Sequence, residues 1–110
     1  MKGSNLGELE EIMLLIVIGL ADDAYGLRIK EEIINKCRRS VSLATIHSTL
    51  HRLEAKGYLK SHYEKSTEEK RSGRPKLVFA VTSTGKTAIQ VIKEIREELW
   101  ANIPSGSLSI

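Results

Sequence analysis

Apolar side chains recur at helical spacing in the middle of the chain. Ile46, Leu50 and Leu53 stand at positions i, i+4 and i+7, which lie on one face of a helix. Ser42 can cap the start of that helix, because its hydroxyl can accept a hydrogen bond from a backbone N–H of the first turn. Gly57 suits the left-handed residue that commonly follows a helix end. The pattern therefore predicts a helix between Ser42 and Gly57.

The opposite side of this predicted helix is small or hydrogen-bonding rather than densely charged. On helical geometry Ala44, Ser48, His51 and Ala55 point away from the apolar stripe. An ordinary solvated face more often carries Glu and Lys, whereas a face that enters a DNA groove needs little bulk and several donors. An amphipathic helix without a ligand is the alternative interpretation. The residues that we expect to contact DNA from this helix are Ser42, Thr45, His47, Ser48, His51 and Arg52.

The segment after the helix has the pattern of a β-hairpin. Residues 76–82 form the clearer strand, because their LVFAV stretch is β-branched, aromatic and apolar, and residues 58–65 form a less clear strand. Between them the sequence STEEKRSGRP contains Gly73 and Pro75 and is otherwise polar, which predicts a long tip. A helix followed by a hairpin with a basic tip is typical of a winged helix. The expected contacts to phosphates or the minor groove are Lys70, Arg71, Arg74 and Lys76.

Two further helices are predicted before residue 42. The first should begin near Ser4 or Asn5 and end at Leu20, with acidic residues in its first turns that suit the positive end of the helix dipole. Its second half, IMLLIVIGL, has no polar side chain on any face and must be covered on all sides. The second helix should span residues 25–37, with Asp23 as its cap and with a buried side made of Leu27, Ile29, Ile33 and Ile34.

A last helix should begin near residues 82–84 and end at about Asn102, before Pro104. It carries a second apolar stripe, and one small core cannot absorb both this stripe and the first helix. We therefore expect the two helices to form a homodimer interface, the alternative being a helix that packs only on its own domain. The expected interface residues are Leu9, Ile12, Met13, Ile16, Ala88, Ile92, Ile95 and Leu99.

Short motifs occur in a fixed order from about residue 9 to residue 99. They are Tyr25-Gly26, Val41-Ser42-Leu43, Thr45-Ile46, Leu50-His51-Arg52-Leu53-Glu54 with Gly57, Gly73-Arg74-Pro75, and Val81-Thr82 with Gly85. In this order and spacing the chain resembles the PadR-type transcriptional regulators. It has His47-Ser48 where that family usually has Tyr, often followed by Pro, and His47 could donate to a phosphate there.

The resemblance implies a transcription regulator, most often a repressor. In some similar regulators a flat aromatic effector binds between the C-terminal helices, where Trp100 could stack on it. The predicted fold is mainly α with a small β hairpin. A winged helix-turn-helix would occupy residues 1–82, a dimerisation helix residues 83–103 and a loose tail residues 104–110. As a homodimer it would bind a palindromic operator in double-stranded DNA. The alternatives are a winged-helix module for protein–protein contact and a metal or ligand sensor of the same fold.

The composition narrows these alternatives. With 110 residues the chain is one small domain, and its net charge of +3 agrees in sign with a nucleic-acid partner. The single cysteine, Cys37, excludes an internal disulfide and fits a cytoplasmic location. We expect no membrane association, because the apolar run is too short to span a bilayer and no secretory signal is present.

The sequence contains no complete catalytic or metal-binding pattern. It has no Ser–His–Asp order, no Gly-rich phosphate loop and no paired cysteines, so we expect no enzyme and no cofactor. His47 and His51 have the i, i+4 spacing of a metal pair, but a third ligand at a convincing spacing is missing. We therefore expect no metal site.

Overall fold

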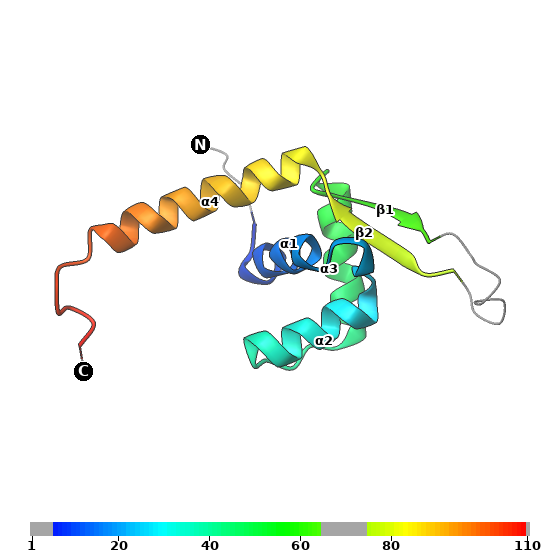
Figure 1. Cartoon of the computed structure of the whole chain (residues 1–110), viewed down its shortest axis with the longest axis horizontal. Coiled ribbons are helices and arrows are strands. Elements are labelled where there is room, and N and C mark those ends of the chain that lie inside the picture. The colour runs from blue at the N-terminus through cyan, green and yellow to red at the C-terminus, as the bar shows by residue number, and fades with distance from the viewer. Residues whose placement is uncertain (1–5, 65–74, 110) are drawn as a thin grey trace.

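The computed structural model describes residues 6–64 and 75–109 of the chain. Along these residues four α-helices and a β-hairpin follow one another in the predicted order of a winged helix (Figure 1). The elements are α1 (Glu8–Leu20), the short 3-10 helix η1 (Ala21–Asp23), α2 (Gly26–Cys37), α3 (Leu43–Ala55), β1 (Leu59–Tyr63), β2 (Leu77–Val81) and α4 (Ser83–Ala101). The first helix thus begins a turn later than the pattern predicted, and both strands are shorter.

One hydrophobic core lies between the first three helices and the inner face of the hairpin. Its completely buried members come mainly from one face of each helix, as the periodicity requires. Each such side chain stabilises the fold by about 1.5–3 kcal/mol relative to an exposed one. The largest are Met13, Leu14, Val17, Ile29, Ile33, Ile46, Leu50 and Leu53.

The hairpin is a two-stranded antiparallel sheet that is fastened to the start of α2. The pairing runs from Leu59 opposite Val81 to Tyr63 opposite Leu77. On the other edge of β2 the amide of Phe79 donates to the carbonyl of Ala24 at 2.8 Å. The base of the hairpin is therefore held against the helix-turn-helix unit.

A second connection joins the end of α3 to the start of α4. Gly57, with φ of +82°, turns the chain from α3 into β1 as expected. The hydroxyl of Thr82 donates to the carbonyl of Gly57 at 2.6 Å and accepts from the amide of Gly85 at 3.0 Å. Gly85 packs so closely on the backbone of Tyr58 that a Cβ at this position would overlap the Tyr58 carbonyl oxygen.

Helix α4 covers the body only with its first half. Ile89 is buried in the core, whereas all residues of α4 from Lys93 onward are exposed. Figure 1 shows this second half projecting well beyond α1 and α2. An ion pair of 2.8 Å between Arg96 and Glu11 links it back to α1. None of the helices among the described residues is long and apolar enough to cross a membrane.

Three predictions about individual residues were wrong. Asp23 does not cap α2; it lies in η1 and pairs with Arg28 at 3.5 Å, while Tyr25 occupies the cap position without a side-chain hydrogen bond. Leu27 and Ile34 are exposed, because they lie across α2 from its buried face. Met13 is fully buried in the core of its own chain and offers no surface to a second copy.

Candidate nucleic-acid interface

The start of α3 is fixed by a small network of hydroxyl groups. Ser42 caps the helix, accepting a hydrogen bond from the Thr45 amide at 3.1 Å and donating to the Thr45 hydroxyl at 3.0 Å. The hydroxyl of Ser48 donates to the Thr45 carbonyl at 3.1 Å. This donation occupies the single proton of Ser48, so its oxygen is left as an acceptor toward the outside.

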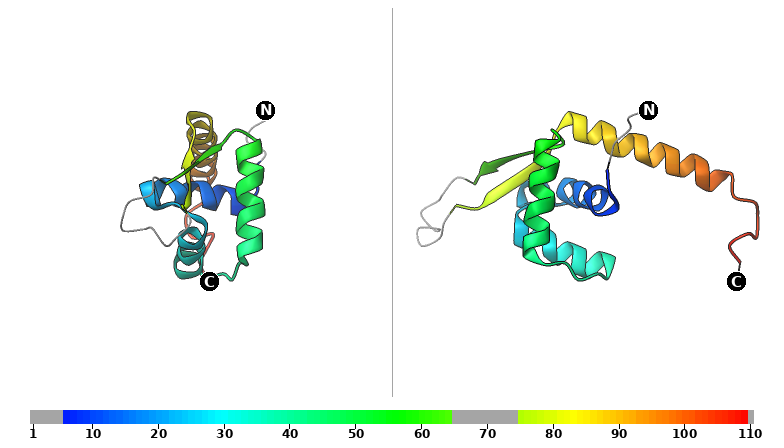
Figure 2. Two further views of the ribbon diagram at one scale, coloured as in Figure 1. Left: turned by 90° about the vertical axis from the view of Figure 1, so that its right-hand side faces the viewer. Right: turned by 180° about the vertical axis from the view of Figure 1, so that it is seen from behind.

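The outward face of α3 is uncovered and carries small polar side chains. Ile46, Thr49, Leu50 and Leu53 face the core, as the apolar stripe predicted for three of them. The right-hand view of Figure 2 shows α3 at the front of the molecule, with the hairpin on one side and α4 on the other. The residues exposed along this face are Ser42, Ala44, Thr45, His47, Ser48, His51, Arg52 and Ala55.

One flank of this face borders the start of α2. A Cβ added to Gly26 would lie 3.0 Å from Cε1 and 3.3 Å from Nε2 of His47. The imidazole of His47 therefore rests against the first turn of α2, and the absence of a side chain at Gly26 makes room for it. Free N–H groups at a helix start attract anions, so His47 sits where a phosphate would be favoured.

The other flank borders the start of α1 and is organised by one carboxylate. The side chain of Glu10 is only 7% exposed. One of its oxygens accepts from the Gly7 amide at 2.8 Å, and the two together accept from Nζ of Lys56 at 2.9 and 3.1 Å. Nε of Arg52 lies 3.4 Å from the second oxygen, and Nη2 of Arg52 donates to the Thr49 hydroxyl at 3.3 Å.

The surroundings of Glu10 keep it ionised. Burial alone would raise the pKa of Glu10, but the hydrogen bond from Gly7, the bond and charge of Lys56 and the bond from Arg52 together outweigh it. The pKa of Glu10 therefore lies below its ordinary value. At neutral pH this flank holds one anion between two cations.

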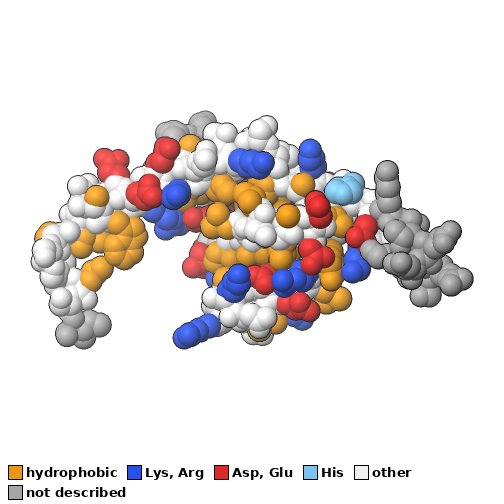
Figure 3. All heavy atoms as spheres, viewed as in Figure 1, with side chains coloured by type: hydrophobic (Ala, Val, Ile, Leu, Met, Phe, Trp, Pro, Cys, Tyr) orange, Lys and Arg blue, Asp and Glu red, His pale blue; other side chains and the backbone are white. Residues whose placement is uncertain are grey.

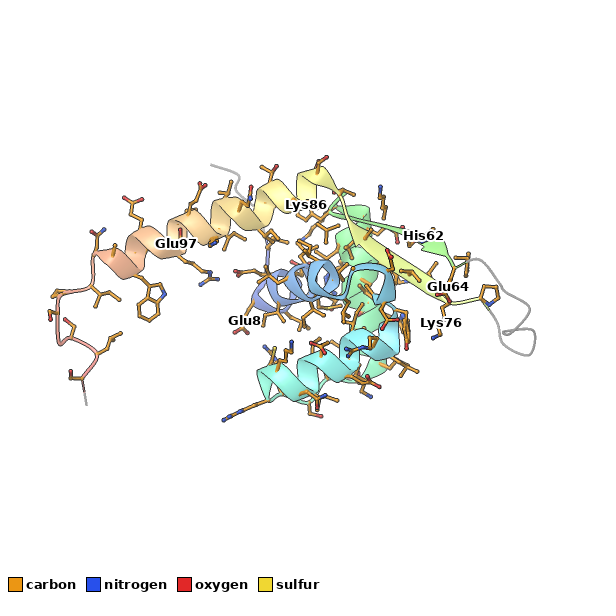
Figure 4. The ribbon with its side chains drawn as sticks, in the orientation of Figure 1. Glu8, His62, Glu64, Lys76, Lys86 and Glu97 are labelled. Carbon is orange, nitrogen blue, oxygen red and sulfur yellow. The ribbon has the colours of Figure 1, made fainter. Side chains whose placement is uncertain are left out.

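The hairpin places Lys76 beside the start of α2. Its Nζ lies 4.1 Å from the centre of the Tyr25 ring, a cation–π distance that holds the side chain on the α2 side of the hairpin (Figure 4). Lys76 is exposed, as a phosphate contact would have to be. The predicted contacts Lys70, Arg71 and Arg74 lie outside the described residues.

The sequence interpretation missed part of the charge arrangement around α3. Arg39, in the turn before α3, pairs with Glu8 at 3.1 Å, and Arg38 adopts the left-handed conformation with φ of +53°. The acidic residues in the first turns of α1, which include Glu8 and Glu10, were interpreted only as favourable to the helix dipole. Their contacts to cations more than 30 residues away depend on how α1 packs, which local spacing does not reveal.

The expected dimer residues divide into covered and open sets. Leu9, Ile12, Ile16, Ala88 and Ile92 are partly buried within the chain, whereas Ile95 and Leu99 are 47% and 63% exposed. Leu15 and Ile18, which the prediction omitted, are also exposed. Trp100 lines a groove of about 260 Å³ between α1 and α4, together with Leu15 and Ile89.

The sequence matches a family model over most of these elements. The model is that of the transcriptional regulator PadR-like family, and it matches residues 14–91. This chain belongs to the PadR-like family. Its members are transcriptional regulators that bind DNA, and not enzymes, so the predicted family, fold class and absence of catalysis are confirmed. Within the described residues no group of three or more His, Cys, Asp or Glu is placed to hold a metal.

Solved structures of PadR-like proteins share the fold. A transcriptional regulator from Clostridium thermocellum is 25% identical with a TM-score of 0.67, and 84% of each chain is covered. A PadR family regulator from Clostridium difficile is 26% identical with a TM-score of 0.62, covering 84% of this chain and 91% of the other. A PadR-like transcription factor from Bacteroides fragilis is 21% identical with a TM-score of 0.65, covering 86% and 89%. No curated protein matches the sequence.

Proposed function

We propose that this PadR-like regulator contacts DNA bases with the outward face of α3 and represses transcription as a homodimer on a palindromic operator. The observation that carries the proposal is the composition of that face. It exposes hydroxyls, imidazoles and methyl groups along a helix that is free to enter a major groove. His47 on one flank and Arg52 on the other would contact the phosphates of the groove walls.

A protein partner on the same face fits the structure less well. Protein interfaces have apolar and aromatic anchors at their centre. Among the described residues, the exposed large apolar side chains lie on α1, α2, β1, α4 and the tail that follows, and α3 has none. The composition of α3 therefore favours the nucleic acid over a protein surface.

The proposed dimer is supported by the apolar side chains that α1 and α4 leave open. Figure 3 shows hydrophobic side chains on the side of the projecting half of α4 that is turned toward the body. Ile95, Leu99 and Trp100 of α4, with Leu15 and Ile18 of α1, are each at least 42% exposed. A second copy placed on these surfaces would cover them and would add a second α3.

Two α3 helices in a symmetric dimer would match the two halves of the proposed palindrome. They can contact equivalent half-sites only if they are held about 34 Å apart, which is one turn of DNA. A dimer bound in this way in the cytoplasm would repress by occupying the promoter. The groove beside Trp100 would take a small aromatic effector, since an indole offers a flat face for stacking.

A salt titration tests DNA binding against the protein-module alternative. The chain is mixed with a duplex of random sequence, and the affinity is measured from low to physiological salt. We expect log K to fall linearly with log salt, with a slope of about −0.9 for each phosphate that is neutralised. Absence of binding at low salt would contradict the proposal and favour the protein-module alternative.

A further inference from the structure

One of the proposed DNA contacts, Arg52, is held in place by hydrogen bonds within the chain. Arg52 stands at the edge of the outward face of α3, and long flexible side chains lose conformational entropy when they contact a phosphate. The loss is smaller if the guanidinium is already held in place before DNA arrives. In this structure Arg52 is held by Glu10 through Nε and by Thr49 through Nη2.

The carboxylate behind Arg52 is buried and held by several contacts. Glu10 is almost completely buried and is fixed from three sides, by the Gly7 amide, by Lys56 and by Arg52 itself. Gly7 belongs to the start of α1 and Lys56 follows the end of α3, so the carboxylate is anchored in two elements at once.

The Arg52 side chain keeps an exposed edge beside this support. Glu10 engages Nε and Thr49 engages Nη2, while 57% of the Arg52 side chain remains exposed. A guanidinium has further donors on its outer edge, in the planar geometry that matches two phosphate oxygens. Lys56 differs in this respect, because its compact ammonium is bonded to both oxygens of Glu10.

We propose that Glu10 is a positioning residue that aims the Arg52 guanidinium at a phosphate on the edge of the operator half-site. The inference rests on the proposed function, in which α3 enters the groove. Glu10 itself does not touch DNA. It raises sequence preference by holding Arg52 in the one orientation that fits the register in which the bases are contacted.

The test compares the affinity of the full-length chain for its selected DNA with that for random DNA, at one salt concentration. Glu10→Gln keeps an oxygen for the Gly7 amide but presents an amide that cannot hold both cations. We expect this variant to lose roughly tenfold in the ratio of specific to random affinity, because a misplaced Arg52 no longer fixes the register in which α3 meets the bases. Glu94→Gln removes the same charge from an exposed site on α4 and should leave the ratio unchanged.

A double-variant cycle separates positioning from a general effect on folding. In an Arg52→Ala background, Glu10→Gln should no longer change the ratio, because its target is gone. Independent, additive losses would overturn the inference. So would a ratio for Glu10→Gln that equals that of Glu94→Gln.

Arg52→Lys provides a check that does not disturb Glu10. Lysine keeps the charge but lacks the fork that Glu10 and Thr49 hold, so we expect the salt slope of the natural chain and the reduced ratio of Arg52→Ala. Full sequence preference in Arg52→Lys would overturn the inference even if Glu10→Gln failed to fold. A natural chain that binds DNA without any sequence preference would instead contradict the proposed function, and this inference with it.

Discussion

Nζ of Lys56 lies 2.9 and 3.1 Å from the two carboxylate oxygens of Glu10, and this contact ties the end of α3 to the start of α1. In the proposed function α3 presents side chains to DNA. Helix α1 forms part of the proposed dimer surface. The contact therefore fixes where the end of α3 lies relative to the start of α1.

The same contact predicts how stability depends on pH. The pKa of Glu10 in the folded chain lies below its ordinary value of 4.5, so the unfolded chain binds the proton more readily. The resulting stabilisation is fully present above pH 4.5 and is lost as the pH falls through the lower, folded-state pKa. Urea denaturation between about pH 6 and pH 3 should show the free energy of unfolding falling with acid.

Glu10→Gln should flatten this acid-side slope. Part of the slope will remain, because the pKa of Glu32 is also lowered, first by the hydrogen bond from Arg28 and then by that from Lys36. An identical pH dependence in the variant and the natural chain would contradict the role given to Glu10.

Two glycines in helices should respond oppositely to alanine. Gly85→Ala should lower the free energy of unfolding by about 1–3 kcal/mol, because the new Cβ overlaps the Tyr58 carbonyl oxygen and the backbone must shift. At Gly19 nothing lies within 4 Å of an added Cβ, so Gly19→Ala should stabilise α1 by about 0.4–1 kcal/mol. Denaturant titrations of both variants check the pair. A neutral Gly85→Ala would show that the packing between α4 and the turn after α3 is looser than described.

Ser48→Glu should abolish specific DNA binding without unfolding the chain. Ser48 is exposed at the centre of the outward face, where a carboxylate would meet phosphates and base acceptors. Thr87→Glu adds the same charge on the exposed side of α4 and serves as the control. Circular dichroism establishes folding, and fluorescence anisotropy with a selected duplex measures binding. A folded Ser48→Glu chain that kept its sequence preference would remove α3 from the interface.

The dimer can be tested by one substitution on α4. Ile95 is 47% exposed in the single chain, and Ile95→Asp would place an unpaired carboxylate in the proposed seam at a cost of several kcal/mol. Sedimentation should show a dimer at micromolar concentration for the natural chain and a monomer or aggregate for the variant. Thr87→Asp, at an exposed position of α4 outside the proposed interface residues, should remain dimeric. A natural chain that sediments as a stable monomer would contradict the proposed interface.

The local pattern was sufficient for the elements but not for their contacts. Ile46, Leu50 and Leu53 predicted the buried face of α3 because helical spacing is a local property. Ser42 and Gly57 marked its ends for the same reason. Met13, in contrast, was assigned to the dimer interface because its helix is apolar on all sides. Spacing alone does not show which side of such a helix packs in the core of its own chain, and Met13 is on that side.

The candidate site was predicted only where it depends on the local pattern of α3. The exposure of Ser48 and His51 follows from α3 alone. The contacts of Glu10 with Arg52 and Lys56 join residues more than 40 positions apart, and they arise only when α1 crosses the end of α3. The cation–π contact between Lys76 and the Tyr25 ring likewise depends on a contact between distant segments, the bridge between Tyr25 and Val78 of β2.

Selection of bound duplexes from a random pool, at defined salt and with the full-length chain, tests the central claim most directly. The account predicts enrichment of an inverted repeat whose half-sites are centred about one DNA turn, 10–10.5 base pairs, apart. Each half-site should be contacted by one α3, so the two halves should be equivalent in sequence. A pool with no enriched sequence, or with a single unpaired half-site, would contradict the account.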